Sequence, residues 1–366
     1  MIPDPLPPVV AGAPPRIAAV VPCFRVKDHV LDVLARIGPE CNSIYVVDDA
    51  CPEHSGDHVH RFCTDPRVRV LRHAENQGVG GAVITGYRAA IADGCDVLVK
   101  IDGDGQMDPA LLPAICGPVV TGQADYAKGN RFYDLANIRR MPTTRILGNV
   151  GLSFLTKLSA GYWDIFDPTN GYTAIHAAVA RQLPLGKISR RYFFETDMLF
   201  RLNTVRAVVV DVPMDARYGD ESSSLRVTRA LGEFLVKNIR NTVKRIFYNY
   251  FLRDFSVATL ELVVGLALLT LGSIVGIDAW LTSARTGTPT LPGTVMLAGL
   301  PILAGLQLVL AFVGFDIASV PRRPLHRVLV RHPRVQPNTD ALELTAPQRV
   351  ASAARESAAV DSPEGR

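Results

Sequence analysis

The sequence predicts an α/β protein with a doubly wound, mostly parallel β-sheet, followed by an amphipathic helix and a two-helix transmembrane hairpin. Three observations lead to this prediction. Short apolar runs alternate with helical stretches up to Met214, acidic residues follow two of the runs, and two long apolar stretches lie nearer the C-terminus. Strand and helix alternation of this kind is typical of a parallel sheet covered by helices on both faces.

The first half of the chain contains four runs that suit buried parallel strands. They are Ile17–Val21, Ile44–Val47, Val68–Leu71 and Val97–Ile101. Helical patterns lie between them, at His29–Ile37, His54–Cys63 and Gly80–Ala92. Ligands of such sheets bind at the carboxyl ends of the strands. Acidic side chains at those ends are therefore candidates for a binding site.

The second half of the chain has the character of a membrane anchor. Basic and apolar residues alternate in Leu225–Arg253 at a spacing that gives one apolar helical face, which suits an anionic bilayer surface. A solvated helix packed on the domain is the alternative. Phe255–Ile277 and Leu291–Phe315 are long and apolar enough to cross a bilayer. Basic residues crowd both outer flanks of this pair, whereas the segment between them holds only Arg285. The positive-inside rule then predicts a multi-pass protein of the cell (inner) membrane, with its α/β domain and both termini in the cytoplasm.

These patterns divide the chain into five expected segments. They are a disordered start (1–15), an α/β domain (16–224), interfacial amphipathic helices (225–254), the transmembrane hairpin (255–317, with helices at about 255–277 and 291–315) and a basic cytoplasmic segment with a disordered tail (318–366). The start is not expected to be a signal peptide, because no basic region precedes an apolar core. The six cysteines form no CxxC pair and are expected to be reduced. The net charge of +4 is too small to indicate binding of nucleic acid.

The strongest chemical signal is the segment Lys100–Pro109, with the sequence KIDGDGQMDP. A buried strand delivers Asp102 and Asp104 to its end with one glycine between them, so both side chains can turn toward one cation. Carboxylate and amide oxygens suit Mg²⁺ or Mn²⁺, which would neutralise a diphosphate leaving group. The alternative is an acidic turn that caps the next helix, and Asp108 before Pro109 fits that role.

A second cluster contains residue types that bind zinc, namely Cys51, His54, His58, His60 and Cys63. Its spacing matches no common zinc pattern, and His58 and His60 point to different sides of a helix. A surface helix is the better interpretation.

Several short segments resemble, in their order and spacing, the family-2 glycosyltransferases with the GT-A fold. In the first half they are Val21–Phe24 (VPCF), Val46–Asp49 (VVDD), Asn76–Ala82 (NQGVGGA) and Asp102–Gln106 (DGDGQ). Farther on they are Lys128–Phe132 (KGNRF), Asp167–Tyr172 (DPTNGY) and Phe194–Asp197 (FETD). With the hairpin, residues 16–320 resemble the polyprenyl-phosphate glycosyltransferases, relatives of dolichyl-phosphate mannose synthase.

The resemblance implies roles for individual residues. The nucleotide-sugar donor would be bound by Pro22, Asp48, Asp49, Asn76, Gly78, Asp102 and Gln106. The metal would be bound by Asp102, Asp104 and Gln106, with Gln106 acting directly or through water. The acceptor phosphate would be bound by Arg131, Arg145, Asn149 and Arg217, because guanidinium donors match phosphate oxygens. Asp104 and Asp197 would be catalytic, Asp197 standing where related enzymes place a general base. Close packing can also explain the glycine-rich turn, and a polar linker can explain the segment around Arg217.

The implied reaction is the inverting transfer of a sugar from UDP-glucose, GDP-mannose or a similar donor to a polyprenyl phosphate at the cytoplasmic membrane face. A phosphate monoester is largely dianionic at neutral pH, with a second pKa of about 6, so it needs little help from a base. Two departures from the family pattern lie on the nucleoside side and leave the nucleotide base open: Arg25-Val26 replace Asn-Glu, and Ala50-Cys51 replace Gly-Ser.

Two other functions remain open at this stage. One is a membrane glycosyltransferase with a hydroxyl acceptor, either a glycolipid or a polysaccharide. Processive synthases of this fold carry a Gln-x-x-Arg-Trp motif and more membrane spans, which this chain lacks. The other is an inactive scaffold that binds nucleotide or lipid. Related enzymes also form tetramers, which implies a homo-oligomer, and the Gly272–Gly276 pair permits close contact between helices.

Overall fold

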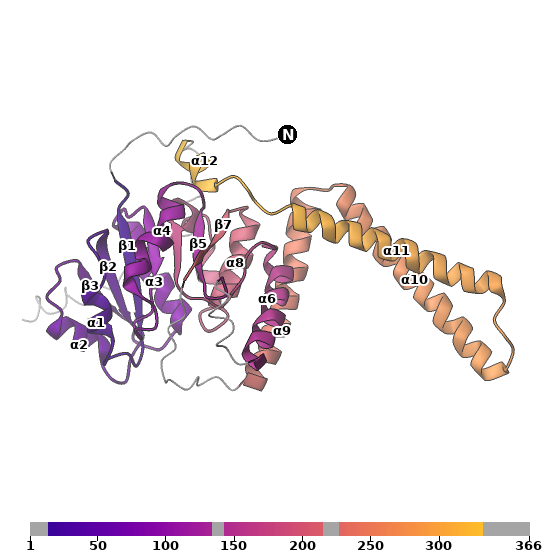
Figure 1. The fold of residues 1–366 in the computed structure, drawn as a ribbon, viewed down its shortest axis with the longest axis horizontal. Coiled ribbons are helices and arrows are strands. Elements are labelled where there is room, and N and C mark those ends of the chain that lie inside the picture. Colours follow the sequence, from indigo (N-terminus) through magenta and orange to yellow (C-terminus); the bar gives the residue numbers. More distant parts are fainter. Residues whose placement is uncertain (1–13, 134–142, 215–226, 332–366) are drawn as a thin grey trace, which may run out of the picture.

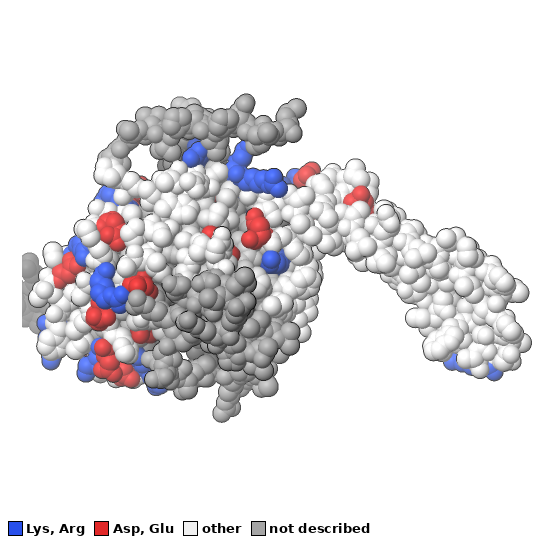
Figure 2. Space-filling model, in the orientation of Figure 1, with Lys and Arg blue, Asp and Glu red and all other residues white. Residues whose placement is uncertain are grey.

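The computed structural model describes residues 14–133, 143–214 and 227–331 (Figure 1). An α/β domain carries a long two-helix arm, and a helical layer lies on the side of the domain from which the arm leaves (Figure 1). The arm is the predicted hairpin. Its surface is almost free of charged side chains along its length (Figure 2).

A seven-stranded sheet forms the centre of the domain, in the order β3-β2-β1-β4-β6-β5-β7. The strands are β1 Ile17–Cys23, β2 Cys41–Asp48, β3 Val68–Arg72, β4 Val97–Lys100, β5 Tyr126–Asn130, β6 Thr173–His176 and β7 Val209–Pro213. β6 runs antiparallel to both of its neighbours, and the other pairs are parallel. The four strands expected from the sequence are confirmed, and the sheet is mostly parallel as predicted.

Helices cover both faces of the sheet. They are α1 Val30–Ala35, α2 Ser55–Phe62, α3 Val79–Ala92, α4 Leu112–Val120, α6 Thr143–Ala160, α7 Ala177–Ala180 and α8 Phe194–Thr204, with the 3₁₀ turns η1 Pro109–Leu111 and η2 Leu185–Lys187. β1 shows why two cores form, since its successive side chains point to opposite faces. Ala18 and Val20 join the core under α3 and α8, whereas Ala19 and Val21 join the core under α1 and α4.

The predicted interfacial segment forms α9 Val227–Phe247 and the π-helical turn η3 Tyr248–Arg253. α9 packs against α6 and α8 (Figure 1). Its fully buried residues are polar, namely Asn238, Asn241 and Arg245, while Phe234 packs edge-on against the Phe193 ring. Its exposed residues include an apolar stripe at helical spacing, formed by Val236, Ile239, Val243 and Phe247. The helix therefore packs on the domain through both polar and apolar contacts and leaves a separate apolar stripe uncovered.

The hairpin consists of α10 Val257–Thr286 and α11 Pro292–Ala318. Both helices are long and apolar enough to span a membrane, and little of either is buried within the protein. Glycines allow their close approach: a Cβ atom on Gly272 would lie 2.7 Å from the carbonyl oxygen of Ala298, and one on Gly305 would lie 2.7 Å from that of Gly265. Gly272 thus serves contact within the hairpin, so it gives no support to the implied oligomer.

The chain returns to the domain after the hairpin. α12 Leu325–Arg331 packs against α7, and the Asp125 carboxylate accepts hydrogen bonds from the backbone N–H groups of Leu325 (2.7 Å) and His326 (2.9 Å). Part of the segment expected to be a basic cytoplasmic region therefore forms a helix that packs on the domain. Both ends of the hairpin are consequently held by the same domain (Figure 1).

Candidate active site

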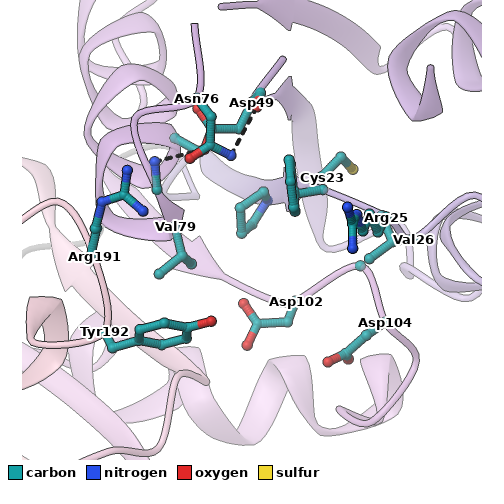
Figure 3. Close-up of a pocket in the computed structure, with 15 residues that line it drawn as sticks. Cys23, Arg25, Val26, Asp49, Asn76, Val79, Asp102, Asp104, Arg191 and Tyr192 are labelled. Atoms are coloured by element: carbon teal, nitrogen blue, oxygen red, sulfur yellow. Dashed lines mark hydrogen bonds between the residues drawn. The ribbon is translucent and has the colours of Figure 1, made fainter. Parts of the chain in front are cut away.

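A cavity of about 580 Å³ opens at the carboxyl ends of β1 and β4. Its walls come from the ends of these strands, the glycine-rich start of α3 and the segment before α8 (Figure 3). The lining residues are Pro22, Cys23, Phe24, Arg25, Val26, Asp49, Asn76, Gly78, Val79, Ala82, Asp102, Gly103, Asp104, Arg191 and Tyr192. The cavity thus brings together most of the residues predicted for the donor and the metal.

Asp102 and Asp104 open into the same cavity, from the turn that follows β4 (Figure 3). The Gln106 backbone N–H donates to Asp104 Oδ1 at 3.0 Å, which fixes the turn. Gln106 itself is exposed and lies outside the lining. Two carboxylates on one wall are hard oxygen donors that fit Mg²⁺ or Mn²⁺ with further ligands from substrate and water. Two of the three predicted metal ligands therefore lie together in the cavity, and metal binding by them stays a prediction.

A buried cation lies behind Asp102. The Lys100 ammonium is 2.8 Å from Asp102 Oδ1 and 3.3 Å from Glu195 Oε1, and Lys100 is almost completely buried. Burial raises the pKa of Glu195 despite the nearby positive charge of Lys100. Burial lowers the pKa of Lys100, but Asp102 and Glu195 more than offset this and raise it. The Lys100 ammonium, which contacts Glu195 as well, therefore holds the Asp102 carboxylate in position on the side away from the cavity.

The Asp49 carboxylate organises the glycine-rich turn. Its Oδ1 accepts a hydrogen bond from the Gln77 backbone N–H at 2.8 Å and its Oδ2 accepts one from Gly78 at 2.7 Å. Asp49 Oδ1 also lies 2.7 Å from His73 Nδ1, and Asn76 donates to the Asp49 carbonyl oxygen at 3.2 Å (Figure 3). Asp49 and Asn76, which were both predicted to bind the donor, thus line the cavity and stabilise the conformation of its wall.

The glycines of this turn also permit close packing. Gly78 has a left-handed φ of 85°, and a Cβ atom on Gly80 would lie 2.6 Å from the Ser189 carbonyl oxygen and from the Phe194 ring. The start of α3 therefore rests directly on the segment before α8. The glycine-rich turn therefore permits close packing, which the sequence analysis gave as the alternative explanation of this motif. This packing brings Arg191 and Tyr192 to the cavity.

Asp48 has a different setting from Asp49. Its carboxylate accepts hydrogen bonds from the Cys51 (2.8 Å) and Gly56 (2.7 Å) backbone N–H groups and does not line the cavity. The nucleoside contact expected of Asp48 stays a prediction, and these bonds favour a role in closing the loop. Ala50 keeps a left-handed φ of 51°, a conformation that suits the glycine usual at this position.

The zinc alternative at α2 finds no support. Among residues 14–133, 143–214 and 227–331, no three His, Cys, Asp or Glu side chains converge in a way that could hold a metal ion. His54 and His60 are exposed, whereas Cys51 is buried and accepts a hydrogen bond from the Arg25 backbone N–H at 3.1 Å. The structure contains a surface helix here, α2, which is the interpretation that the sequence favoured.

Asp197, the predicted base, lies on α8 and is buried away from the cavity lining. Its Oδ2 accepts a hydrogen bond from the Ser189 backbone N–H at 2.9 Å, and its Oδ1 accepts one from Asn241 Nδ2 at 3.0 Å. A catalytic role for Asp197 stays a prediction. Its contacts instead fit a residue that ties α8 to α9 and holds the segment before α8.

Of the four predicted acceptor-phosphate residues, Arg131 has a described side chain, and it does not line the cavity. Arg131 follows β5 and makes a two-pronged contact with buried Asp167, with both hydrogen bonds at 2.8 Å. Arg145 and Asn149 belong to α6, but their side chains are outside the described part, and Arg217 lies outside the described residues. Phosphate binding by these residues stays a prediction.

Several lining residues were not among the predicted site residues, and three of them can contact a donor through polar groups. Arg25, Arg191 and Tyr192 contribute charge and an aromatic ring, and Arg191 and Tyr192 lie opposite the two aspartates (Figure 3). Arg25 follows β1 with a left-handed φ of 58°. Its place next to the VPCF segment was the available signal. Nothing local marks Arg191 and Tyr192, because only the packing of α3 on the segment before α8 brings them here.

The chain is similar to several known proteins. The chain is 33% identical over 204 residues to an undecaprenyl-phosphate mannosyltransferase of Micrococcus luteus, covering 54% of this chain and 82% of that protein. It is 31% identical over 156 residues to a UDP-N-acetylglucosamine–dolichyl-phosphate N-acetylglucosaminyltransferase of Methanococcus voltae, covering 43% of this chain and 62% of that one. Among solved structures, it is similar to a Mycobacterium tuberculosis glucosyl-3-phosphoglycerate synthase in complex with Mn²⁺, UDP and glucosyl-3-phosphoglycerate, with a TM-score of 0.47, 19% identity, and coverage of 63% of this chain and 80% of that one.

The family assignment follows from the match of residues 19–183 to the profile of Glycosyl transferase family 2 and from the Micrococcus relative. The resemblance seen in the sequence is thereby confirmed, and the mostly parallel sheet agrees with the GT-A fold expected of such enzymes. The chain belongs to glycosyl transferase family 2 and is a glycosyltransferase.

Proposed function

We propose that this glycosyltransferase moves a sugar from a nucleotide-sugar donor to a polyprenyl phosphate, with inversion at the anomeric carbon, at the cytoplasmic face of a membrane. The observation that supports this most strongly is the pairing of Asp102 and Asp104 on one wall of a cavity in a domain that carries an apolar hairpin. The relatives in Micrococcus luteus and Methanococcus voltae, both named for lipid-phosphate acceptors, support the same acceptor class.

Asp102 and Asp104 would hold the divalent ion, either Mg²⁺ or Mn²⁺. Bound there, the ion would neutralise the diphosphate that leaves with the nucleoside. Lys100 keeps the Asp102 carboxylate in place before the ion arrives, and its own positive charge lowers the repulsion between Asp102 and Glu195. Arg25 and Arg191 line the same cavity and add positive charge for the diphosphate.

The donor nucleotide fits the part of the cavity bounded by Pro22, Asn76 and the start of α3. Backbone N–H groups at a helix start face anions, although Asp49 already engages those of Gln77 and Gly78. The Tyr192 ring lines the same cavity and offers an aromatic surface, and its phenol can donate a hydrogen bond. We assign no nucleotide base, because the residues that depart from the family pattern lie on this side.

The membrane arrangement follows from the way both ends of the hairpin return to one domain. A hairpin with both ends on the domain crosses the bilayer twice and leaves the domain on one side. Basic residues at its foot favour the cytoplasmic side. The exposed stripe of Val236, Ile239, Val243 and Phe247 on α9 would rest on the same leaflet. The active site would then lie beside the polar head of a polyprenyl phosphate.

In the proposed step, an oxygen of the lipid phosphate attacks the anomeric carbon as the nucleoside diphosphate leaves from the opposite face. One bond forms, one breaks, and the dianionic phosphate has no proton to lose. The reaction therefore does not need Asp197 as a base, which agrees with its use in contacts to Ser189 and Asn241. The protein contributes mainly by positioning the reactants and by electrostatic stabilisation.

The test uses the full chain in detergent with undecaprenyl phosphate, Mg²⁺ or Mn²⁺, and labelled UDP-glucose, GDP-mannose and UDP-GlcNAc in parallel. Label should enter the organic-extractable lipid from one donor and be lost with EDTA. Asp104→Asn should lower the rate by about 100-fold or more. Asp57→Asn on exposed α2 is the matched control and should retain the wild-type rate. Transfer that is unaffected by EDTA and by Asp104→Asn would refute the metal assignment.

A further inference from the structure

Four arginines gather where the hairpin leaves the domain, and the proposed reaction uses none of them. Arg206 follows α8, Arg253 ends η3, and Arg322 and Arg323 lie between α11 and α12. We refer to these four residues as the foot cluster. Figure 2 shows basic side chains on the surface at this point and acidic ones at the near end of the arm, beyond which the arm is almost free of charge up to its tip.

Direct contacts bring the members of the foot cluster together. Arg206 Nη2 donates to the Ser319 carbonyl oxygen at 2.7 Å, just after the end of α11. Arg322 follows Ser319 by three residues, so it lies within about 11 Å along the chain. Arg253 donates to the carbonyl oxygen of Thr204, two residues before Arg206. Three segments that are far apart in sequence therefore converge on one spot.

Among the described residues, no carboxylate forms an ion pair with the foot cluster. Arg206 and Arg253 donate to neutral groups, namely backbone carbonyls and the Asn249 side-chain oxygen. None of the four forms an ion pair with a carboxylate in the described ranges, and this includes Asp254, the neighbour of Arg253. Burial, with the positive charge of Arg206, lowers the pKa of Arg253. Uncompensated like charges so close together call for an anion.

The position of the cluster indicates which anion. α10 begins at Val257, four residues after Arg253, and α11 ends at Ala318, one residue before Ser319. The arginines therefore lie at the level where the apolar helices end, which is the headgroup level of a bilayer that contains the hairpin. Arg253, Arg322 and Arg323 are exposed and can reach outward. The guanidinium group matches phosphate oxygens in geometry and charge.

We propose that the foot cluster is a binding site for the phosphate of an anionic phospholipid headgroup at the base of the hairpin. The bound lipid would neutralise the cluster and fix the angle at which the hairpin leaves the domain. This inference requires the hairpin to lie in a membrane, as proposed above. It does not require glycosyl transfer, so a failed transfer assay would leave it standing.

The experiment measures thermal unfolding of the full chain in dodecylmaltoside, with phosphatidylglycerol or phosphatidylcholine added to the micelles. Phosphatidylglycerol should raise the unfolding temperature of the wild type by about 3 °C or more beyond phosphatidylcholine. The variant Arg322→Gln/Arg323→Gln changes only exposed side chains and should lose at least half of this difference. Arg285→Gln, in the opposite end of the hairpin, is the matched control and should keep it.

Two further additions identify the source of the phosphate. Inorganic phosphate should give no comparable shift, because the site is built at headgroup level, and a full shift with it would overturn the assignment to a lipid. A shift with undecaprenyl phosphate but none with phosphatidylglycerol would overturn it in favour of the acceptor. Equal shifts with both phospholipids, or an undiminished shift in Arg322→Gln/Arg323→Gln, would show that the cluster binds no anionic headgroup. Arg206→Gln provides a second variant with the same expectation.

Discussion

The guanidinium of Arg245 on α9 makes two hydrogen bonds, of 2.6 and 3.0 Å, to the carboxylate of Asp316 near the end of α11. Tyr250 and Trp163 donate to the same carboxylate at 2.6 and 3.0 Å. The pair is buried, so it joins the base of the hairpin to the helical layer of the domain without access of water. A site that must meet a lipid substrate is thereby held at a fixed position relative to the anchor.

Replacing Arg245 with Met should therefore destabilise the protein strongly. It leaves the Asp316 carboxylate buried without its cation, and breaking a buried pair in this way typically costs about 3–5 kcal/mol. Thermal unfolding in detergent measures the effect, with Arg285→Met as the control on an exposed arginine. The double variant Arg245→Met/Asp316→Asn should recover part of the loss. An unfolding temperature equal to that of the wild type would show that the contact does not hold the hairpin to the domain.

Gly80→Ala should disturb the cavity through packing alone. The added methyl would lie 2.6 Å from the Phe194 ring and from the Ser189 carbonyl oxygen, so the segment before α8 must move. We expect a loss of about 1–3 kcal/mol in stability and a higher KM for the donor, because Arg191 and Tyr192 move with that segment. Gly117→Ala on α4 meets nothing within 4 Å and should be neutral or slightly stabilising. The same result for both variants would refute the packing argument.

Arg191→Gln should raise the donor KM about tenfold while changing kcat less. The side chain lines the cavity opposite Asp102 and Asp104, where it can contact the diphosphate. A hydrogen bond to a charged group contributes about 1.5–3 kcal/mol, which is tenfold or more in affinity. Steady-state kinetics with varied donor measures this, and Arg181→Gln on the exposed end of α7 is the control. A donor KM unchanged from the wild type would remove Arg191 from the donor site.

His176 should make stability fall in mild acid. Its ring stacks on that of His326 with centroids 4.3 Å apart, and burial, with the charge of His326, lowers its pKa from 6.5 to about 4. Above pH 6.5 the residue is neutral in the folded and unfolded states alike. Between pH 6.5 and 4, His176 is protonated in the unfolded chain but remains neutral in the folded protein. The free energy of unfolding therefore falls by up to about 3 kcal/mol over this range.

His176→Asn tests this pH dependence. The His176 ring accepts a hydrogen bond from the Ala178 backbone N–H at 3.1 Å, and asparagine can keep this cap. Unfolding temperatures at pH 7.5 and pH 5 should therefore differ less in the variant than in the wild type. A variant that loses as much stability on acidification as the wild type would contradict the assignment.

The sequence was a good guide wherever a local pattern determines the structure. Apolar runs marked the strands, and the spacing of Asp102 and Asp104 at the end of β4 marked the cavity wall. The sequence was a poor guide where the hydrogen-bond partners of a side chain depend on tertiary structure. Asp48 and Asp49 are neighbours, yet one closes a loop and the other shapes the glycine-rich turn.

The same limit explains the rest of the site and the anchor. The hydrogen bond between Asp197 and Asn241 depends on how α9 packs against α8, and the sequence did not indicate it. The hydrogen bond between the His326 ring and the Asp125 carboxylate joins residues that are 201 positions apart in the sequence. On α9, the sequence showed the apolar stripe but not that polar residues, including Arg245, would face the domain. These features depend on tertiary packing, which no local pattern records.

The central claim is that the acceptor is a lipid phosphate rather than a hydroxyl, and one comparison tests it most directly. The full chain in detergent is given its active donor with either undecaprenyl phosphate or undecaprenol, which differ only in the phosphate. We expect labelled, organic-extractable product from undecaprenyl phosphate and none from undecaprenol, because a hydroxyl acceptor must lose a proton to a base whereas a phosphate dianion need not. Labelled product from undecaprenol at a comparable rate would contradict it.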